Sequence, residues 1–412
     1  MILAPNHANT FIDPCMIAIA MDEQVSFIAR ADVFESNWVN AIFTSFKMIP
    51  VFRQGDGYAN SIVRNKITFD KCAYMLKHKH PVIIFPEGNN TFIRRLQKVK
   101  KGAARIAFQA EEESDFTLGA YVVPINVYYD KFLEGFRHDM YLSFGDPIAV
   151  ADYKSVYLDN PIKAINNLTK DLKAAMLDLQ LHIESEKYYN LIDRVKDIYN
   201  ADMRQKMGLS EGHIANRFKA HKAIVAVFDE AEKFIPEQLD DLAVLVNNYD
   251  ENLTNLGVSD AVVLEKKETH KSVLYVKSLK ALLLFPLYVY GALNNAITYS
   301  LSMYLGQNFV KAQKYRPAVE VGVMAILGTL VTIAQMVVVG WFTGSFWLAL
   351  AYLVTVPVTG YFAYDYWLAQ NKLLEKWRLE NSLKNGKGLA LIKQRADIVS
   401  KIKTIVQAVE TK

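Results

Sequence analysis

The chain has 412 residues, of which 51% are hydrophobic and 22% charged, and its formal net charge is +4. This length suffices for two or three domains with buried cores, and the apolar excess is high for a soluble protein. Its cysteines, Cys15 and Cys72, exclude a disulfide framework and suit a reducing compartment. The small excess of cations fits an anionic membrane surface better than nucleic acid.

The beginning of the chain has the pattern of the end of a strand. Only Ile2-Leu3-Ala4 precede Pro5-Asn6-His7, whereas strands commonly have about five to six residues. We therefore expect either that the natural product begins further upstream or that this strand is unusually short. No secretory signal precedes the first motif, which predicts a cytosolic location for the polar part of the chain.

Short runs rich in β-branched and aromatic residues alternate with helical patterns in the first 155 residues. The predicted strands are Val25–Ala29, Met48–Phe52, Val82–Phe85, Tyr121–Tyr128 and Met140–Phe144, and the predicted helices between them include Asn60–Lys77 and Gly102–Glu111. Strands that alternate with helices are typical of an α/β fold. The pattern therefore predicts an α/β domain over residues 1–158.

The pattern changes near Pro161. From there, apolar residues recur at spacings of three and four, as in an amphipathic helix. They are Ile165, Leu168, Leu172, Met176, Leu179 and Ile183. Charged, helical sequence continues to about Lys280, which predicts an all-helical domain over residues 159–280.

Two segments without any charged residue follow, over residues 281–310 and 321–364. A bilayer-spanning helix needs roughly 20 apolar residues. The second segment is long enough for a hairpin of two transmembrane helices, at 321–341 and 346–364, with a turn at residues 343–345. Residues 281–310 are interrupted by Pro286 and by Asn294-Asn295, so we expect an interfacial or re-entrant segment there.

Residues 365–412 are predicted to form a basic cytosolic tail. From Lys372 onward this region has ten Lys or Arg against four acids, and cytosolic loops are enriched in cations. If the first domain is cytosolic as well, the number of spans is even. This argument predicts a multi-pass membrane protein whose first domain faces the cytosol.

His7 and Asp13 are the first candidates for chemistry. Asp is a common helix cap and Pro a common first helical residue, so Asp13-Pro14 predicts the start of a helix, with His7 in the loop before it. The aspartate can cap this helix, orient the imidazole, or do both. A carboxylate that holds one ring nitrogen leaves the other basic enough to accept a proton from a hydroxyl.

Two further motifs lie at predicted strand ends, where open α/β sheets bind ligands. The first is Phe85-Pro86-Glu87-Gly88, and the second is Met48-Ile49-Pro50-Val51-Phe52-Arg53. A run of cations without acids follows the first motif, and such a run suits either a solvated surface or a phosphate group. The run comprises Arg94, Arg95, Lys98, Lys100, Lys101 and Arg105.

Taken together, NHANTFID, IPVFR, FPEG and Val122-Val123-Pro124-Ile125 resemble, in order, the motifs of the glycerol-3-phosphate and lysophosphatidate acyltransferase superfamily. The run RLQKVKKGAARIAF is most similar to the branch of fungal glycerol-3-phosphate/dihydroxyacetone-phosphate acyltransferases. Five residues separate His7 from Asp13, one more than is usual in the superfamily. The resemblance implies a glycerolipid-acyltransferase-like domain with a mixed sheet flanked by helices.

The resemblance also implies direct acyl transfer from acyl-CoA or acyl carrier protein to glycerol 3-phosphate or lysophosphatidate, without a covalent acyl-enzyme. It makes His7 the general base and Asp13 its orienting partner, and it implies neither a metal nor a cofactor. The residues that it implies for acceptor binding are Arg53, Glu87, Gly88, Arg95 and Lys101.

Two alternatives remain open from the sequence. One is an acyltransferase that remodels lysophospholipids with larger headgroups. The other is a non-catalytic membrane scaffold that binds anionic lipid through its basic runs. The scaffold accounts for the charge and the apolar segments but not for His7 with Asp13 and FPEG. Convergence of His7, Asp13, Arg53 and Glu87 in one cleft would favour an enzyme.

Overall fold

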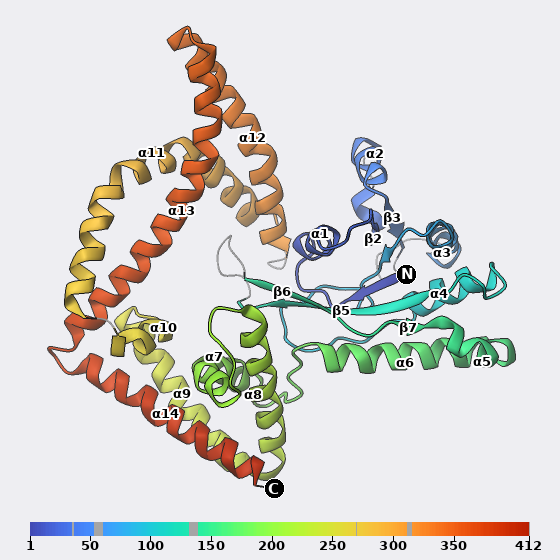
Figure 1. Ribbon diagram of the computed structural model, residues 1–412, viewed down its shortest axis with the longest axis horizontal. Helices are drawn as coiled ribbons and strands as arrows, with labels where there is room; N and C mark the ends of the chain where they lie inside the picture. The colour runs from blue at the N-terminus through green and yellow to red at the C-terminus, as the bar shows by residue number, and fades with distance from the viewer. Residues whose placement is uncertain (35–36, 53–60, 132–138, 269, 311–314, 412) are drawn as a thin grey trace. The chain divides into compact units, whose positions relative to one another are not determined.

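The computed structural model describes residues 1–34, 37–52, 61–131, 139–268, 270–310 and 315–411 (Figure 1). They form two compact units, one of Met1–His182 with Glu211–Lys222 and one of Ile183–Ser210 with Ala223–Lys412. The predicted fold class is confirmed, because a mixed sheet with flanking helices is followed by a helical region and by long apolar helices.

The first unit is built around a sheet to which seven strands of the described residues contribute, in the order β3-β2-β4-β1-β5-β6, with β7 also paired to β5. The first five strands pair in parallel, whereas β6 and β7 run antiparallel to β5. The strands are β1 (Ile2–Pro5), β2 (Ser26–Arg30), β3 (Met48–Val51), β4 (Val82–Ile83), β5 (Tyr121–Tyr129), β6 (Met140–Phe144) and β7 (Ile148–Ala149).

Strand β1 lies between β4 and β5, and its side chains alternate between two hydrophobic cores. Ile2 and Ala4 belong to one core and Leu3 to the other, because successive side chains of a strand point to opposite faces. Burial on both faces explains why this strand is apolar throughout. The central position of β1 therefore places the loop after it in the middle of the sheet edge.

The helices of the first unit cover the two faces of this sheet. Side chains of α3, α4 and α6 pack into the core of Ile2, and α1 packs into the core of Leu3. The helices are α1 (Ile12–Ile19), α2 (Asn37–Ser45), α3 (Ser61–Lys77), α4 (Gly102–Glu112), α5 (Lys154–Asp159) and α6 (Pro161–Leu179), with short 3-10 helices η1 (Ala31–Phe34) and η3 (Val150–Tyr153).

Helix α6 lies with the sheet, whereas the sequence assigned it to the helical domain that begins at residue 159. Its stripe of Leu168, Leu172 and Met176 is almost fully buried in the core shared with α4. An amphipathic stripe shows that a helix packs against something but not against which element. The first unit therefore extends beyond residue 158.

The second unit contains a polar helical part and long apolar helices. Its polar helices are α7 (Tyr189–Lys206), most of α8 (Ile214–Phe234), α9 (Pro236–Leu256), α10 (Asp260–Leu264), η4 (Glu265–Glu268) and α14 (Lys387–Glu410). The region expected to be a separate tail is part of this unit. Arg395 of α14 is 8% exposed, and it pairs with Asp260 (Nε to Oδ1, 2.9 Å) and donates to the carbonyl of Ile198.

Among the residues that the structure describes, three helices are long and apolar enough to cross a membrane: α11 (Lys271–Phe309), α12 (Arg316–Thr343) and α13 (Phe346–Ser382). Helices α12 and α13 contain the predicted hairpin, whose turn includes Gly344 with a φ of +63°. Residues 281–309 lie within the continuous α11, so Pro286 and Asn294-Asn295 do not interrupt the helix as the sequence suggested.

Helix α11 bends, and its packing partner changes along its length (Figure 1). Its first half packs on α13, where the Tyr366 hydroxyl donates to the carbonyl of Ala281 (2.9 Å). Its second half packs on α12, where a Cβ on Gly306 would meet the side chain of Glu320. Near the change of partner, the side chain of Asn295 donates to the carbonyl of Gly291 within the helix and to that of Val356 in α13. Side chains that enter the backbone ladder in this way, and Pro286 nearby, are known causes of helix bending.

Candidate active site

His7 follows the carboxyl end of the central strand β1, the position at which open α/β sheets bind ligands. Asn6 fixes the chain there, because its side chain continues the pairing with β5. Its Nδ2 donates to the carbonyl of Val127 (3.1 Å), and its Oδ1 accepts from the amide of the same residue (2.7 Å). The backbone that presents His7 is therefore held by the sheet.

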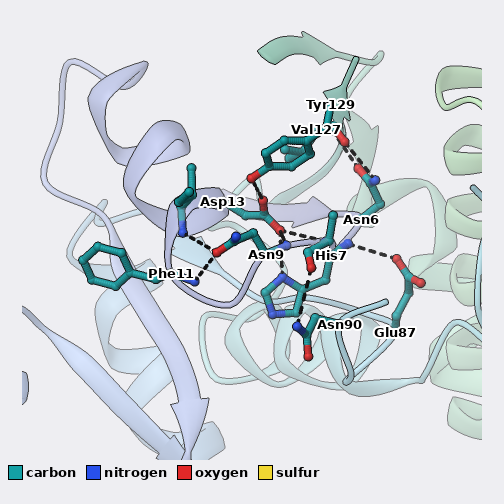
Figure 2. A network of polar contacts seen from close by, with 11 residues as sticks. Asn6, His7, Asn9, Phe11, Asp13, Glu87, Asn90, Val127 and Tyr129 are labelled. Atoms are coloured by element: carbon teal, nitrogen blue, oxygen red, sulfur yellow. Dashed lines mark hydrogen bonds and ion pairs between the residues drawn. The ribbon is translucent and has the colours of Figure 1, made fainter. Parts of the chain in front are cut away.

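The carboxylate of Asp13 is fully buried and accepts four hydrogen bonds (Figure 2). Its Oδ2 lies 3.0 Å from Nδ1 of His7 and accepts from the amides of Ala8 and Asn9, each at 2.8 Å. Its Oδ1 accepts from the hydroxyl of Tyr129 (2.5 Å). The additional residue between His7 and Asp13 is thus compatible with direct contact between the two side chains.

The role of helix cap falls to Asn9. Its Oδ1 accepts from the amides of Phe11 and Ile12 at the start of α1, and these amides otherwise have no partner within the helix. Asp13 lies in the first turn of the helix and points back to the loop. Of the two contacts that the sequence left open for Asp13, the carboxylate makes the one with the imidazole.

The imidazole of His7 contacts Phe85 with its ring face and Asp13 with its edge. It stacks on Phe85 with ring centroids 3.8 Å apart, and its side chain is 12% exposed. Because every other group bonded to Asp13 is a donor, the carboxylate is an acceptor and Nδ1 carries the proton. The neutral ring then has its lone pair on Nε2.

Glu87 lies against the backbone of the histidine loop. Its Oε1 accepts from the amide of His7 and its Oε2 from that of Gln97, both at 3.1 Å. The pKa of the Glu87 carboxyl is raised to about 7, mainly by burial and to a smaller extent by the charge of Asp13, while the two amide hydrogen bonds act in the opposite direction. Glu87 therefore links the FPEG turn to the loop of His7.

Gly88 completes this turn in a conformation that favours glycine. Its φ is +66°, and its amide donates to the carbonyl of Phe85 (3.0 Å). A Cβ at this position would lie 2.5 Å from Nζ of Lys100. Gly88 thus permits both the left-handed backbone and the close approach of a lysine to FPEG.

A cleft brings together three of the predicted site residues, namely His7, Glu87 and Arg95. Arg94 also lines it, but this residue is 6% exposed and donates to the carbonyls of Tyr129 and Asp130. The other lining residues are Asn6, Ala8, Thr91, Ile93, Asn126, Val127, Tyr128, Tyr129, Gln180 and Leu181.

The remaining predicted cations lie elsewhere. Lys101 is exposed at the start of α4 and is not among the described residues that line the cleft. Arg53 lies outside the described residues. No group of three or more His, Cys, Asp or Glu that could hold a metal occurs among the residues that the structure describes.

The sequence did not identify Tyr129 or Asn6 as site residues. Tyr129 is the last residue of β5 and comes to Asp13 only through the pairing of β5 with β1. Its position at the carboxyl end of a predicted strand was the available signal, but tyrosine is also common within sheets. Asn6 adjoins His7, and an Asn after a strand is more often a turn residue.

Part of the chain is similar to known proteins. Residues 1–128 match the family model Acyltransferase. No curated protein matches the chain. Among solved structures, the chain is similar to the 1-acyl-sn-glycerophosphate (LPA) acyltransferase PlsC from Thermotoga maritima, with 16% identity and a TM-score of 0.27. That alignment covers 42% of this chain and 66% of the other, slightly less than two thirds of its length. Residues 1–128, less than a third of the chain, are therefore similar to an acyltransferase domain.

Proposed function

We propose that the protein is a membrane-bound O-acyltransferase. It moves a fatty acyl group from acyl-CoA or acyl carrier protein to a hydroxyl of glycerol 3-phosphate or lysophosphatidate. The observation that supports this most directly is the contact of His7 with the fully buried Asp13, in a cleft that also contains Arg95. An imidazole oriented by a carboxylate is the arrangement that activates a hydroxyl.

In this proposal His7 is a general base. Its Nε2 takes the proton of the acceptor hydroxyl, and the oxygen attacks the carbonyl carbon of the thioester. The carbon–sulfur bond then breaks, and the thiolate receives the proton from His7. Asp13 stabilises the imidazolium that forms between the two proton transfers. Backbone amides would stabilise the oxyanion of the tetrahedral intermediate.

The acceptor phosphate is assigned to Arg95, because this residue lines the cleft of His7 and a guanidinium can form paired hydrogen bonds with a phosphate. Glu87 and Gly88 shape the cleft through the turn that supports the histidine loop. Arg53 keeps its proposed role in phosphate binding on the motif resemblance alone. Lys101 has weaker support, since it lies away from the cleft.

The apolar helices are proposed to anchor the protein in the membrane, where lysophosphatidate and the phosphatidate product reside. We infer that the catalytic domain faces the cytosol, because the cations after α13 predict a cytosolic end. A cytosolic site also has access to acyl-CoA or acyl carrier protein. Membrane lipids and the acyl thioester are thus the expected partners.

The test supplies membranes containing the full chain with labelled acyl-CoA and one acceptor at a time. The proposal expects acylation of glycerol 3-phosphate or of lysophosphatidate, and it prefers glycerol 3-phosphate on the motif resemblance. A strong preference for lysophosphatidylcholine would identify a remodelling acyltransferase instead. No reaction with any acceptor, with acyl-CoA and acyl carrier protein both tried, would favour the scaffold.

A further inference from the structure

A second cleft lies within the second unit, between α11 and α13, where the charge-free segments of both helices end. On α11 the last cation before the apolar segment is Lys280, and on α13 the first charge after it is Asp365. A helix that enters a bilayer changes from charged to apolar at the level of the lipid headgroups. The cleft is therefore expected at the membrane surface.

The polar wall of this cleft has more cations than acids. Lys372 and Lys376 both bind Glu265, each with Nζ 2.7 Å from a carboxylate oxygen. Lys277 and Lys280 are exposed, and neither forms an ion pair with another residue in the described part of the chain. Asp365 also lines the cleft, so four lysines face two acids and the cleft has an excess of positive charge.

Apolar side chains also line the cleft, among them Leu284, Phe362 and Leu373. Leu284 and Phe362 belong to the charge-free segments of α11 and α13, so this apolar lining continues into the part of the helices that is long and apolar enough to cross a membrane. A ligand that fills such a cleft has an anionic end and an apolar end.

Two hydrogen bonds join the two helices near this cleft. The Tyr366 hydroxyl donates to the carbonyl of Ala281 (2.9 Å) beside the lysines, and Nε1 of Trp377 donates to Oγ of Ser278 (3.1 Å). Trp and Tyr are the residues that accumulate at the membrane–water interface. The cleft is thus preformed at the depth of a headgroup.

We propose that this cleft binds an anionic phospholipid. Lys277 and Lys280 contact the phosphate of the headgroup, and an acyl chain lies along Leu284 and Phe362. Basic clefts between membrane helices bind anionic headgroups by this combination of charge and apolar surface. This site belongs to the membrane anchor and does not depend on the proposed acyltransferase activity.

The test titrates the full-length protein in neutral detergent with phosphatidylglycerol and with phosphatidylcholine, and it counts bound lipid by native mass spectrometry. We expect phosphatidylglycerol to bind the more tightly. Substitution of both lysines, K277Q/K280Q, should weaken its binding by about 30-fold, because each cation contributes a factor of about five. The matched control K384Q/K387Q removes the same charge from exposed positions outside the cleft and should change the affinity less than about twofold.

A third variant, K277R/K280R, keeps the charge and should retain most of the affinity. Equal affinity for the two lipids, or equal losses in the Gln variant and its control, would show that no specific site exists. Competition by millimolar inorganic phosphate as effective as that by phosphatidylglycerol would show a phosphate site that does not recognise lipid. Circular dichroism of each variant confirms that it is folded.

Discussion

The hydroxyl of Tyr129 lies 2.5 Å from Oδ1 of Asp13, although 116 positions separate the two residues in the chain. Burial raises the pKa of this phenol, and the charge of Asp13 raises it further, so the hydroxyl remains a donor. The carboxylate that orients His7 is thereby fixed from both sides, by the amides of its own loop and by the neighbouring strand β5.

Tyr129→Phe should reduce both stability and turnover, because it leaves Oδ1 of Asp13 buried with one donor fewer. Loss of a hydrogen bond to a charged group costs about 1.5–3 kcal/mol of unfolding free energy, and we expect kcat to fall by roughly tenfold. The control is Tyr153→Phe, which removes an exposed hydrogen bond from a tyrosine to a carboxylate, that of Asp171, outside the cleft. A variant that loses stability but keeps full kcat would show that Tyr129 is not needed for positioning.

His7→Ala should lower kcat by about 10²–10⁴-fold, the usual loss when a general base is removed. Asp13→Asn should lower kcat by a similar factor. It should disturb the fold little, because the amide oxygen of the new asparagine can still accept from the loop amides and its Nδ2 can donate to the hydroxyl oxygen of Tyr129. Activity is measured in membranes, and folding is followed by thermal denaturation. If Asp13→Asn only lowers the melting temperature, the aspartate has a structural role alone.

The sequence predicted the elements of the first unit well because their patterns are local. Each of the five predicted strands is present, and α3 and α4 differ from their predicted bounds by one residue. His7, Asp13 and FPEG could be proposed as site residues because each lies at a strand or helix end. What depends on packing was not predictable, including the approach of Tyr129 to Asp13 and the burial of α6 against the sheet.

The same distinction holds for the cations of the site. Six lie close together in the sequence between Arg94 and Arg105, and their order does not separate them by role. In the structure Arg94 supports the end of β5, Arg95 lines the cleft, and Lys101 is exposed at a helix start. The separation arises from the irregular path of residues 89–100, for which no sequence periodicity exists.

Glu87 predicts a dependence of stability on pH. Between its ordinary pKa of 4.5 and its folded value of about 7, the folded protein binds a proton that the unfolded chain does not. Stability therefore falls as the pH rises through this window, by about 3 kcal/mol for a shift of this size. The Glu87→Gln variant lacks this titration. The difference in melting temperature between the variant and the parent protein should therefore shift in favour of the variant from pH 4.5 to pH 7 and stay constant above pH 7. A difference between the two proteins that stays constant with pH would contradict the raised pKa.

Arg95→Ala should raise the KM for the phosphate-bearing acceptor by about 10- to 100-fold, the cost of losing a hydrogen bond between two charged groups. The KM for acyl-CoA should change little. Arg105→Ala is the matched control, because it removes a nearby exposed arginine that does not line the cleft and has no proposed role. Equal effects of the two substitutions on the acceptor KM would show that the phosphate binds elsewhere.

Arg395 of α14 and Asp260 of α10 form an ion pair, although α10 precedes the three apolar helices and α14 follows them. Paired residues lie on the same side of a membrane, so the number of complete crossings between them is even. The number of crossings is even if α12 and α13 each cross the membrane and α11 enters and leaves it on the same side. The bend of α11 is compatible with that path.

We therefore predict that His270 and Asn308, at the two ends of α11, are accessible from the same side and Thr343, at the hairpin turn, from the other. Single cysteines at these positions, in a chain with C15S and C72A, are labelled with an impermeant maleimide in sealed vesicles. Labelling after permeabilisation controls for reactivity. Labelling of the 270 and 308 cysteines from opposite sides would mean that α11 crosses completely. In that case the ion pair between Arg395 and Asp260 could not form in the membrane. A pair of cysteines placed at positions 260 and 395 should then fail to cross-link.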